Sequence, residues 1–304
     1  MGPQHWWPAG SAFEVVVGAY LTQNTAWTNV ERAMGNLRQA GVLSISGIRN
    51  IPVEELELLV RPAGYFRQKA ARLKLLVAHL DAHHGGSLAA MFDRTGETLR
   101  AELLGLTGIG PETADSILLY AAGGEVFVVD SYTRRIFERH GLVKAETGYE
   151  EIRLAVQKAL TGEDAVSRPE GAREDQRQNQ LPQLKARAGC NYNDQRQRQS
   201  QLSHLNAAKP EARREGGAPE SRATETPTAE TAMLETRTPE SSVAGLATHT
   251  PSVASEMKRS ELSRRYNEFH ALLVQTAKHY CVKGEPKCEG CPLRRLLPPE
   301  RRPG

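Results

Sequence analysis

Two segments of the chain carry residues whose types and spacing could do chemistry, and the first is a glycine turn. Residues 106–115 read LTGIGPETAD, in which two glycines flank an isoleucine and a proline follows. Gly108 and Gly110 allow a backbone to approach a ligand closely, and Pro111 suits the first position of a helix. Exposed amides at a helix start attract anions such as phosphates. The same turn could also be a plain connector between two helices.

The second segment contains an acidic residue, Asp130, within VFVVDSYTRRIF. An aspartate in front of Ser-Tyr-Thr is a good N-cap, because its side chain can accept hydrogen bonds from the first free amides of a helix. A carboxylate fixed at the same place could instead stabilise a positively charged transition state and help a water molecule to attack. From spacing alone, the capping role is the simpler interpretation.

Three of the four cysteines, Cys281, Cys288 and Cys291, are crowded near the C-terminus. In an intracellular chain such crowding indicates a metal or cluster site before it indicates disulfides. The fourth, Cys190, is isolated in a polar segment, and we assign it no role.

The elements that must position these residues are predicted to be helices. The segment FEVVVGAYLTQ is apolar on all sides and predicts a central buried helix. Val30, Met34 and Leu37 mark one face of a second helix. The segments FRQKAARLKLLVAHLDAHH, PETADSILLYAA and SRRYNEFHALLVQTAKHYC repeat this period, whereas VFVV is too short to argue for a sheet. We therefore predict an all-α fold with short connections.

The composition limits the number of domains, the kind of partner and the cellular location that we expect. A chain of 304 residues that is 39% hydrophobic can hold two domains, and a net charge of +3 permits a nucleic-acid partner without requiring one. Residues 163–256 are dominated by Gln, Arg, Glu, Thr, Ser and Pro, so we predict a disordered insertion. No apolar run approaches the ~18 residues of a membrane span, and the N-terminus has no signal-peptide pattern. We expect a cytoplasmic protein without a membrane partner.

The order of these segments resembles the endonuclease III, or HhH-GPD, superfamily of DNA glycosylases. LTGIGPETADSILLYAAGG followed by VFVVDSYTRRIF looks like the family's helix–hairpin–helix and Gly/Pro…Asp motif, and LTQNTAW and CVKGEPKCEGC fall where the family has corresponding segments. The resemblance covers about 1–160 and 258–297. It implies a helical barrel domain over 12–124 and a discontinuous second domain over 125–162 and 257–304, with 1–11 packing nearby. The family usually has a further helix ahead of the first motif, so the true start could lie upstream.

The resemblance implies that Asp130 is the catalytic residue and that the nucleotide is extruded from duplex DNA before its N-glycosidic bond is cleaved. Bifunctional members have a nucleophilic lysine where this chain has Glu112. Because a carboxylate cannot form a Schiff base, we expect a monofunctional glycosylase without lyase activity. Glu112 could also merely complement the start of its helix. DNA contacts are implied for Gly108, Ile109, Gly110, Thr113 and Gln23, the last as a residue that fills the gap left by the nucleotide or simply ends a helix.

The tryptophans indicate which class of damaged base the protein removes. All three lie near the N-terminus, in a stretch that resembles the 3-methyladenine DNA glycosylase III branch. Alkylation makes a purine cationic, and an indole ring attracts a cation by about 0.5–2 kcal/mol. We expect Trp7 and Trp27 to stack on the two sides of an alkylated base, with Trp6 a weaker candidate. Packing in the core is the alternative role for these rings.

The cysteine loop matches three ligands of the family's iron–sulfur motif. Cys281, Cys288 and Cys291 have the spacing that the resemblance requires for a 4Fe–4S cluster, but the fourth position is Leu297. A cluster with an external fourth ligand and a metal-free loop are the two alternatives. With or without iron, the loop could present basic residues to DNA phosphates. These are Lys283, Lys287, Arg294 and Arg295.

Three functions follow as expectations. The first is a monomeric, monofunctional glycosylase that removes a damaged, alkylated base from double-stranded DNA. The second is a bifunctional glycosylase and lyase like endonuclease III. The third, from another class, is a helix–hairpin–helix protein that binds DNA without catalysis.

Overall fold

The computed structural model describes residues 4–162, 252–254 and 256–301 of the chain. These residues belong to one compact unit. The predicted insertion over 163–256 lies almost wholly outside the described residues, as does Cys190. Residues 252–254 and 256 of this range are described. Ala254 is buried, and its amide donates to the carbonyl of Ala9 at 3.1 Å. This backbone contact holds Ala254 against the N-terminal segment.

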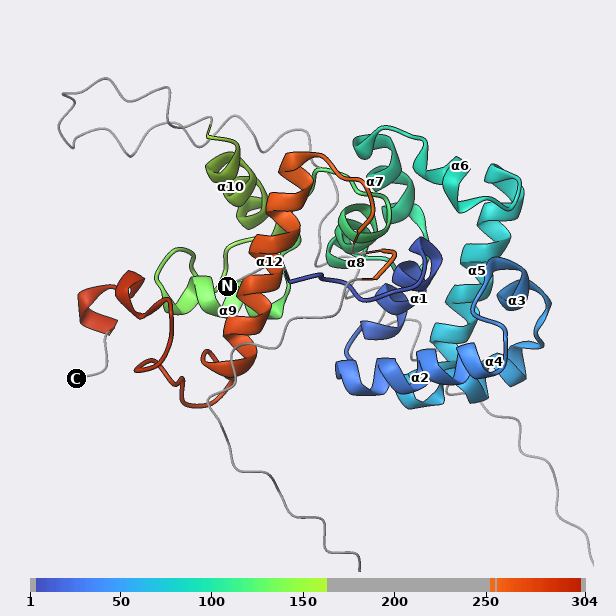
Figure 1. The fold of residues 1–304 in the computed structure, drawn as a ribbon, viewed down its shortest axis with the longest axis horizontal. Coiled ribbons are helices and arrows are strands. Elements are labelled where there is room, and N and C mark those ends of the chain that lie inside the picture. The colour runs from blue at the N-terminus through green and yellow to red at the C-terminus, as the bar shows by residue number, and fades with distance from the viewer. Residues whose placement is uncertain (1–3, 163–251, 255, 302–304) are drawn as a thin grey trace, which may run out of the picture. The chain divides into compact units, whose positions relative to one another are not determined.

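The described residues form helices and no strands, which confirms the all-α prediction (Figure 1). The first half contains α1 (Ala12–Thr22), α2 (Trp27–Gln39), α3 (Ile45–Asn50), α4 (Val53–Val60), the 3₁₀ turn η1 (Arg61–Ala63) and α5 (Phe66–His84). It continues with α6 (Leu88–Phe92), α7 (Gly96–Gly105), α8 (Pro111–Ser116) and the π-helical turn η2 (Ile117–Ala121). The remainder comprises α9 (Ser131–Arg139), α10 (Tyr149–Thr161), α12 (Glu261–His279), η3 (Arg294–Leu296) and η4 (Pro299–Arg301). No described helix has both the length and the apolar character needed to span a bilayer.

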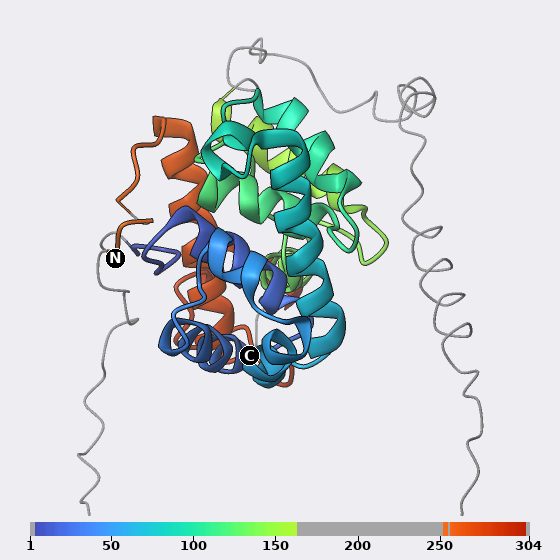
Figure 2. The ribbon, with the colours of Figure 1, turned by 90° about the vertical axis from the view of Figure 1, so that its right-hand side faces the viewer.

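The helix α1 lies at the centre of the core, as its sequence predicts. Ser11 caps its start by accepting a hydrogen bond from the Glu14 amide, and eight of its residues are buried. It contacts α2, α5, α8 and η2, and Figure 2 shows it enclosed by these helices. Burying several Val, Leu and Tyr side chains contributes roughly 1.5–3 kcal/mol each before the entropy cost of folding. The helix thus fixes the frame against which α8 is placed.

The helix α12 is separated from the rest by the insertion in sequence but not in space. It packs against α9 and η2, and the N-terminal segment runs beside it: the Asn267 side chain donates to the Trp6 carbonyl at 3.2 Å, and the Gln4 amide donates to Glu268. Figure 1 shows α12 next to α9, with the N-terminal segment passing it on the way to α1. The further division into two helical domains with boundaries near 124 and 257 stays a prediction.

A buried carboxylate, Asp115, ties α8 to its neighbours. Its side chain is fully buried and accepts a bidentate hydrogen bond from Arg100 of α7, at 2.6 and 3.1 Å. It also accepts from the Tyr149 hydroxyl at 2.8 Å, and Arg153 lies 3.9 Å away. These partners come from α7, which precedes the glycine turn, and from α10, so this network fixes the orientation of α8.

We predict that Asp115→Ala lowers the free energy of unfolding by about 3–5 kcal/mol, because it leaves Arg100 and Arg153 without their buried partner. Glu150→Ala is the matched control: Glu150 pairs with the same arginines but is half exposed, so its loss costs at most about 1 kcal/mol. Urea unfolding of both variants measures the difference. Equal destabilisation by the two substitutions would show that the network does not anchor α8.

Candidate active site at Asp130

Asp130 ends a buried extended run and starts α9. The four residues before it, 126–129, are at most 3% exposed and anchor the segment in the core. The Asp130 side chain accepts a hydrogen bond from the Thr133 amide at 2.7 Å, so it is the N-cap of α9, as its sequence context predicts. This bond uses Oδ1 and leaves Oδ2 for another role.

The second carboxylate oxygen of Asp130 faces a histidine that the sequence did not single out. Nε2 of His270, on α12, lies 3.5 Å from Oδ2, and Nδ1 is 2.5 Å from the Tyr120 hydroxyl. Burial by itself would raise the pKa of Asp130, but the charge and hydrogen bond of His270 and the amide of Thr133 outweigh it and hold that pKa below its usual value. The carboxylate is therefore ionised although its side chain is only 14% exposed.

Glu112 lies in the first turn of α8, close enough for the charge of Asp130 to act on it. Glu112 is exposed to solvent, although the protein atoms near its carboxyl group remove part of that group's hydration. This desolvation and the negative charge of Asp130 raise the pKa of Glu112 to about 7, against a smaller opposing effect of His270. The two carboxyl groups thus have pKa values shifted in opposite directions, an arrangement typical of catalytic sites.

The glycine turn has the backbone that its sequence requires. Gly108 has a φ of +82°, and a Cβ there would lie 2.1 Å from Nε of Arg72, so only glycine fits. Ile109 is 3% exposed, and its amide donates to the Leu106 carbonyl at 3.1 Å. Gly110 is the N-cap residue of α8. The isoleucine side chain therefore anchors the turn, and only its backbone can face a ligand.

Gln23 joins the glycine turn to the end of α1. Its side-chain amide donates to the Gly108 carbonyl at 2.9 Å and to the Thr113 hydroxyl at 3.0 Å. Its oxygen accepts from Arg72 of α5 at 2.9 Å. Gln23 and Thr113 thus lie together at the turn, and in this conformation their polar groups bond to the protein. The role of Gln23 within the DNA stack stays a prediction, and it requires these bonds to exchange.

A buried lysine, Lys69, stabilises the end of α1, next to Gln23. The Lys69 amine, on α5, donates to the carbonyls of Leu21, Gln23 and Ala63 and to the Thr25 hydroxyl, at 2.7–3.0 Å. Burial and the charge of Arg72 lower the pKa of Lys69 to about 8. The side chain is 2% exposed, so it fixes the end of α1 and cannot reach a substrate.

The three tryptophans lie near Tyr120 and His270: Trp7 contacts Tyr120 and Trp27, and Trp6 contacts His270. Their stacking on a base stays a prediction. Trp7 and Trp27 lie 5.3 Å apart at 90°, so their rings touch edge to face and no base fits between them without a ring turning. They line a pocket of about 210 Å³ together with Glu14, Glu31 and Arg38. A larger open hollow of about 630 Å³ lies over Leu88–Asp93 and contains none of the site residues.

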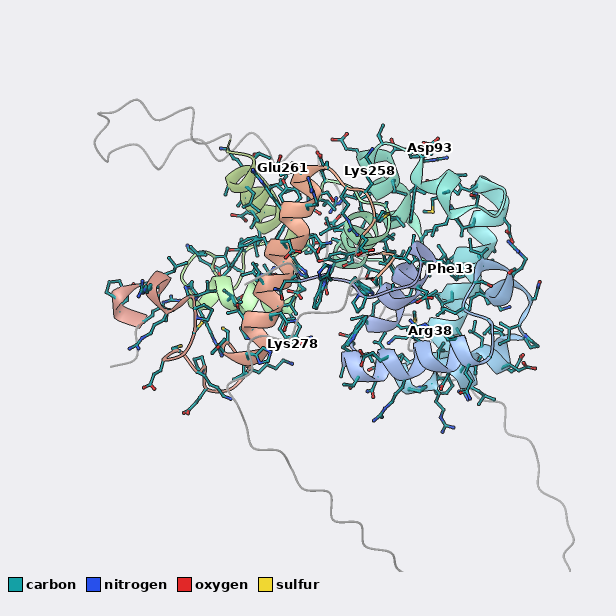
Figure 3. All side chains as sticks on the ribbon, in the orientation of Figure 1. Phe13, Arg38, Asp93, Lys258, Glu261 and Lys278 are labelled. Carbon is teal, nitrogen blue, oxygen red and sulfur yellow. The ribbon has the colours of Figure 1, made fainter. Side chains whose placement is uncertain are left out.

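Trp6, the weaker candidate in the sequence, is the tryptophan that contacts the His270 ring, 6.5 Å away. Lys278, in the last turn of α12 (Figure 3), lies over the Trp6 ring at 5.5 Å. Burial lowers the pKa of Lys278, and the charges of Glu31 and Asp130 act against this shift. The sequence pattern did not single out His270 and Lys278. A helical period predicts that they lie on one helix, but it does not show which distant residues they contact. The buried residues of α12 also include Ser263, Asn267, Gln275 and Thr276, so a polar residue on that face does not by itself single out His270.

The cysteine loop is held by arginines of α9. Nη1 of Arg139 lies 3.3 Å from Sγ of Cys281 and donates to the Val282 carbonyl, and Arg135 donates to the Cys281 carbonyl at 2.6 Å. At the fourth ligand position, Leu297 is buried and has no atom that can bind iron. The described residues therefore do not fit a four-cysteine cluster.

Comparison with known proteins identifies the family. Residues 17–161 match the profile of HhH-GPD superfamily base excision DNA repair proteins. A Methanocaldococcus jannaschii protein whose name assigns it as a DNA repair glycosylase is 48% identical over 160 residues, which span 52% of this chain and 73% of that protein. The chain belongs to the HhH-GPD superfamily. The predicted resemblance is thereby confirmed.

Two solved structures are also similar. An endonuclease III–DNA complex matches with a TM-score of 0.54 and 16% identity, over 94% of this chain and 83% of the other, which supports the shared fold. The 3-methyladenine DNA glycosylase of H. pylori matches with a TM-score of 0.48 and 32% identity, over 54% and 77% of the two chains.

The raised pKa of Glu112 has a consequence for stability. The protonated carboxyl group favours the folded state below pH 4.5, its ordinary pKa, and this contribution is lost as the pH rises through about 7. Because Glu112 is exposed, solvent screening reduces this contribution. We predict that the unfolding temperature of the wild type falls by no more than a few degrees relative to Glu112→Gln between about pH 5 and about pH 8. Glu97→Gln, an exposed glutamate in the first turn of α7, is the control and should follow the wild type. Parallel curves for wild type and Glu112→Gln would contradict the shift.

Proposed function

We propose that this protein is a monofunctional DNA glycosylase, which hydrolyses the N-glycosidic bond of a damaged base flipped out of double-stranded DNA. The observation that carries the proposal is the ionised Asp130 carboxylate, which lies beside the glycine turn of a DNA-repair family and has Glu112 as its neighbour. The family match supports a repair glycosylase, and the reaction type and the lesion are our inference from these side chains.

Asp130 has the properties that the reaction needs. As the base departs, positive charge develops on the sugar, and a fixed negative charge stabilises that state more than the ground state. The cap at Thr133 holds the carboxylate in place, while His270 keeps it ionised and oriented through Oδ2. We assign His270 as a positioning residue that acts through Asp130. Water is then the nucleophile, and Asp130 orients it or accepts its proton.

The available amines favour hydrolysis over a Schiff-base reaction. Glu112 occupies the first turn of α8, where it can offer no amine, and Lys69 is buried with four oxygen partners. Lys278 is the lysine whose charge interacts with Asp130 in the structure. It is also the only specific observation in favour of the bifunctional alternative among the described residues.

The surroundings of the tryptophans favour a cationic base. Indole rings attract cations through their faces, and the pocket at Trp7 and Trp27 is also lined by two carboxylates. Glu31 accepts a hydrogen bond from the Trp27 indole at 2.8 Å, and Glu14 is paired with Arg38 at 2.7 Å. A purine alkylated at a ring nitrogen carries the positive charge that such a site selects. We therefore propose alkylated purines as the substrate class.

We predict that Asp130→Asn lowers the single-turnover rate of base release by about 10²–10⁴-fold. Asparagine caps a helix as well as aspartate does, so the fold and DNA binding should be kept while the charge is lost. Release is measured on duplexes that contain alkylated, oxidised or mismatched bases. If the wild type binds every duplex but releases no base, or if Asp130→Asn is as fast as the wild type, the catalytic proposal fails and a binding protein remains.

We predict no covalent adduct when the protein is treated with borohydride on DNA containing an abasic site, because only an amine nucleophile forms a reducible Schiff base. Endonuclease III under the same conditions is the positive control. An adduct that disappears in Lys278→Gln would establish the bifunctional alternative and identify its nucleophile.

We propose that the cysteine loop holds no four-cysteine cluster and that the arginines of α9 keep the loop in place instead. Lys283, Lys287, Arg294 and Arg295 are exposed on or next to this loop and can approach phosphates. We predict that anaerobically purified protein lacks the broad visible absorption of an iron–sulfur cluster and contains less than one cluster per chain by iron analysis. A stoichiometric 4Fe–4S spectrum would contradict this and would require a ligand outside the described residues.

A further inference from the structure

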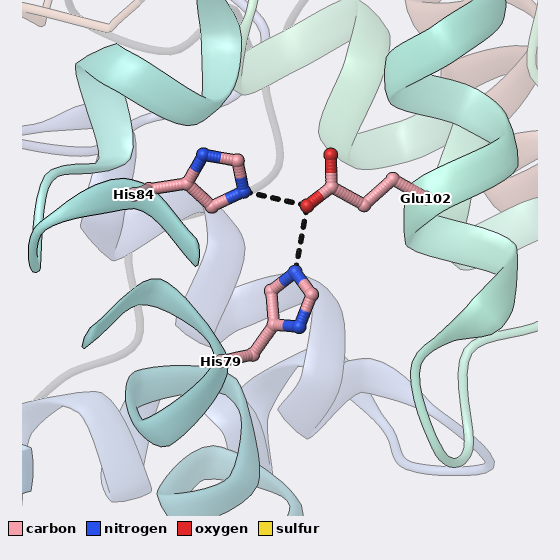
Figure 4. A group of neighbouring side chains, drawn as sticks. All are labelled: His79, His84 and Glu102. Carbon is pink, nitrogen blue, oxygen red and sulfur yellow. Dashed lines mark hydrogen bonds and ion pairs between the residues drawn. The ribbon is translucent and has the colours of Figure 1, made fainter. Parts of the chain in front are cut away.

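A second group of chemically active side chains lies away from Asp130, where the end of α5 meets α7. His79 and His84 of α5 both direct Nε2 at the same carboxylate oxygen of Glu102, at 2.6 and 2.5 Å (Figure 4). The three ligand atoms lie within 4.8 Å of one another. The side chains of His84 and Glu102 are 3% and 12% exposed, and that of His79 is 21% exposed, so the group is largely enclosed and solvent reaches it mainly at His79.

The donor set indicates which ligand it could hold. Two imidazole nitrogens and one carboxylate oxygen suit zinc and its first-row neighbours, whereas magnesium and calcium prefer oxygen alone. A tetrahedral zinc ion with ligands at about 2.0–2.1 Å separates its donors by roughly 3.4 Å. The carboxylate oxygen would therefore move away from each imidazole nitrogen by less than one ångström. The two imidazole nitrogens, which lie within 4.8 Å of each other, would approach by at most about 1.4 Å. A fourth position would remain open to water.

The neighbouring charges are compatible with a cation. Arg94 lies 3.0 Å from Oε2 of Glu102, the oxygen that the histidines do not use, and its side chain is 43% exposed. It can keep this contact as an outer partner of a ligating carboxylate or swing into solvent. His83, whose ring is 4.6 Å from that of His79, is exposed and lies outside the ligand group.

We propose that His79, His84 and Glu102 form a binding site for a divalent transition-metal ion of the zinc class, with a structural role. The site links the C-terminal end of α5 to α7, and α7 leads directly into the glycine turn. The same α5 supplies Arg72, which packs on Gly108 and bonds to Gln23. A bound ion would thus fasten the first helix of the hairpin to the helix that supports the turn.

The test uses the full chain with Cys288→Ser and Cys291→Ser, so that the three cysteines of the C-terminal loop cannot bind the metal together. Zn²⁺ is titrated by calorimetry, and Co²⁺ is used as a spectroscopic probe. We expect one ion per chain, visible ligand-field bands without thiolate charge-transfer absorption, and a rise in unfolding temperature of about 5–10 °C at ~100-fold excess over the dissociation constant. His79→Asn, at the most exposed ligand, should weaken binding by more than the ~10–100-fold that loss of an outer partner costs.

His83→Asn is the matched control, because it removes a neighbouring imidazole from the same helix but leaves the proposed ligands intact. It should bind Zn²⁺ and Co²⁺ like the parent protein. Glu102→Gln provides a second ligand variant, and circular dichroism verifies that each variant is folded. The proposal is overturned if the folded parent binds no ion, or if binding persists unchanged in both His79→Asn and Glu102→Gln. It is also overturned if His83→Asn abolishes binding as completely as His79→Asn does.

Discussion

The charge of Asp130 persists in a half-buried place because two different neighbours stabilise it. The start of α9 supplies the Thr133 amide to one oxygen, and α12 supplies His270 to the other. Desolvation alone would favour the protonated acid, and a protonated Asp130 could not stabilise a cationic sugar. The packing of α12 against α9 is therefore a requirement of the proposed chemistry, although some 90 residues of insertion separate α12 from α10 in the sequence.

The glycine turn is positioned by polar contacts on both of its sides. On one side, Gln23 and Arg72 bond to each other and pack on Gly108. The Lys69 amine donates hydrogen bonds to two carbonyls at the end of α1. On the other side, Asp115 connects α8 to α7 and α10. Charged groups buried in this way are costly unless each has a partner, so their pairing specifies one arrangement of the turn. A turn that is rigid before binding loses less entropy when it meets a phosphate backbone.

Much of this arrangement could be predicted from the sequence. The all-α fold, the central α1, the buried stripe of α2 and the cap at Asp130 follow from local periods and turn chemistry, which do not depend on distant residues. His270 could not be found in this way, because its value lies in a contact with Asp130 across 140 positions. The same holds for the His79–His84–Glu102 group, which arises where two helices cross. The edge-to-face contact of Trp7 and Trp27 also depends on packing between separate segments, which local sequence patterns do not describe.

The central claim is that Asp130 presents a negative charge to a sugar that becomes positive. The most direct measurement compares how tightly the protein binds two duplexes, one with a cationic pyrrolidine analogue of the abasic site and one with its neutral tetrahydrofuran counterpart. Because the comparison requires no knowledge of the lesion, it isolates the electrostatic contribution. The account predicts that wild type prefers the cationic analogue and that Asp130→Asn loses most of this preference while it binds the neutral duplex equally well. An unchanged preference in Asp130→Asn would contradict the account.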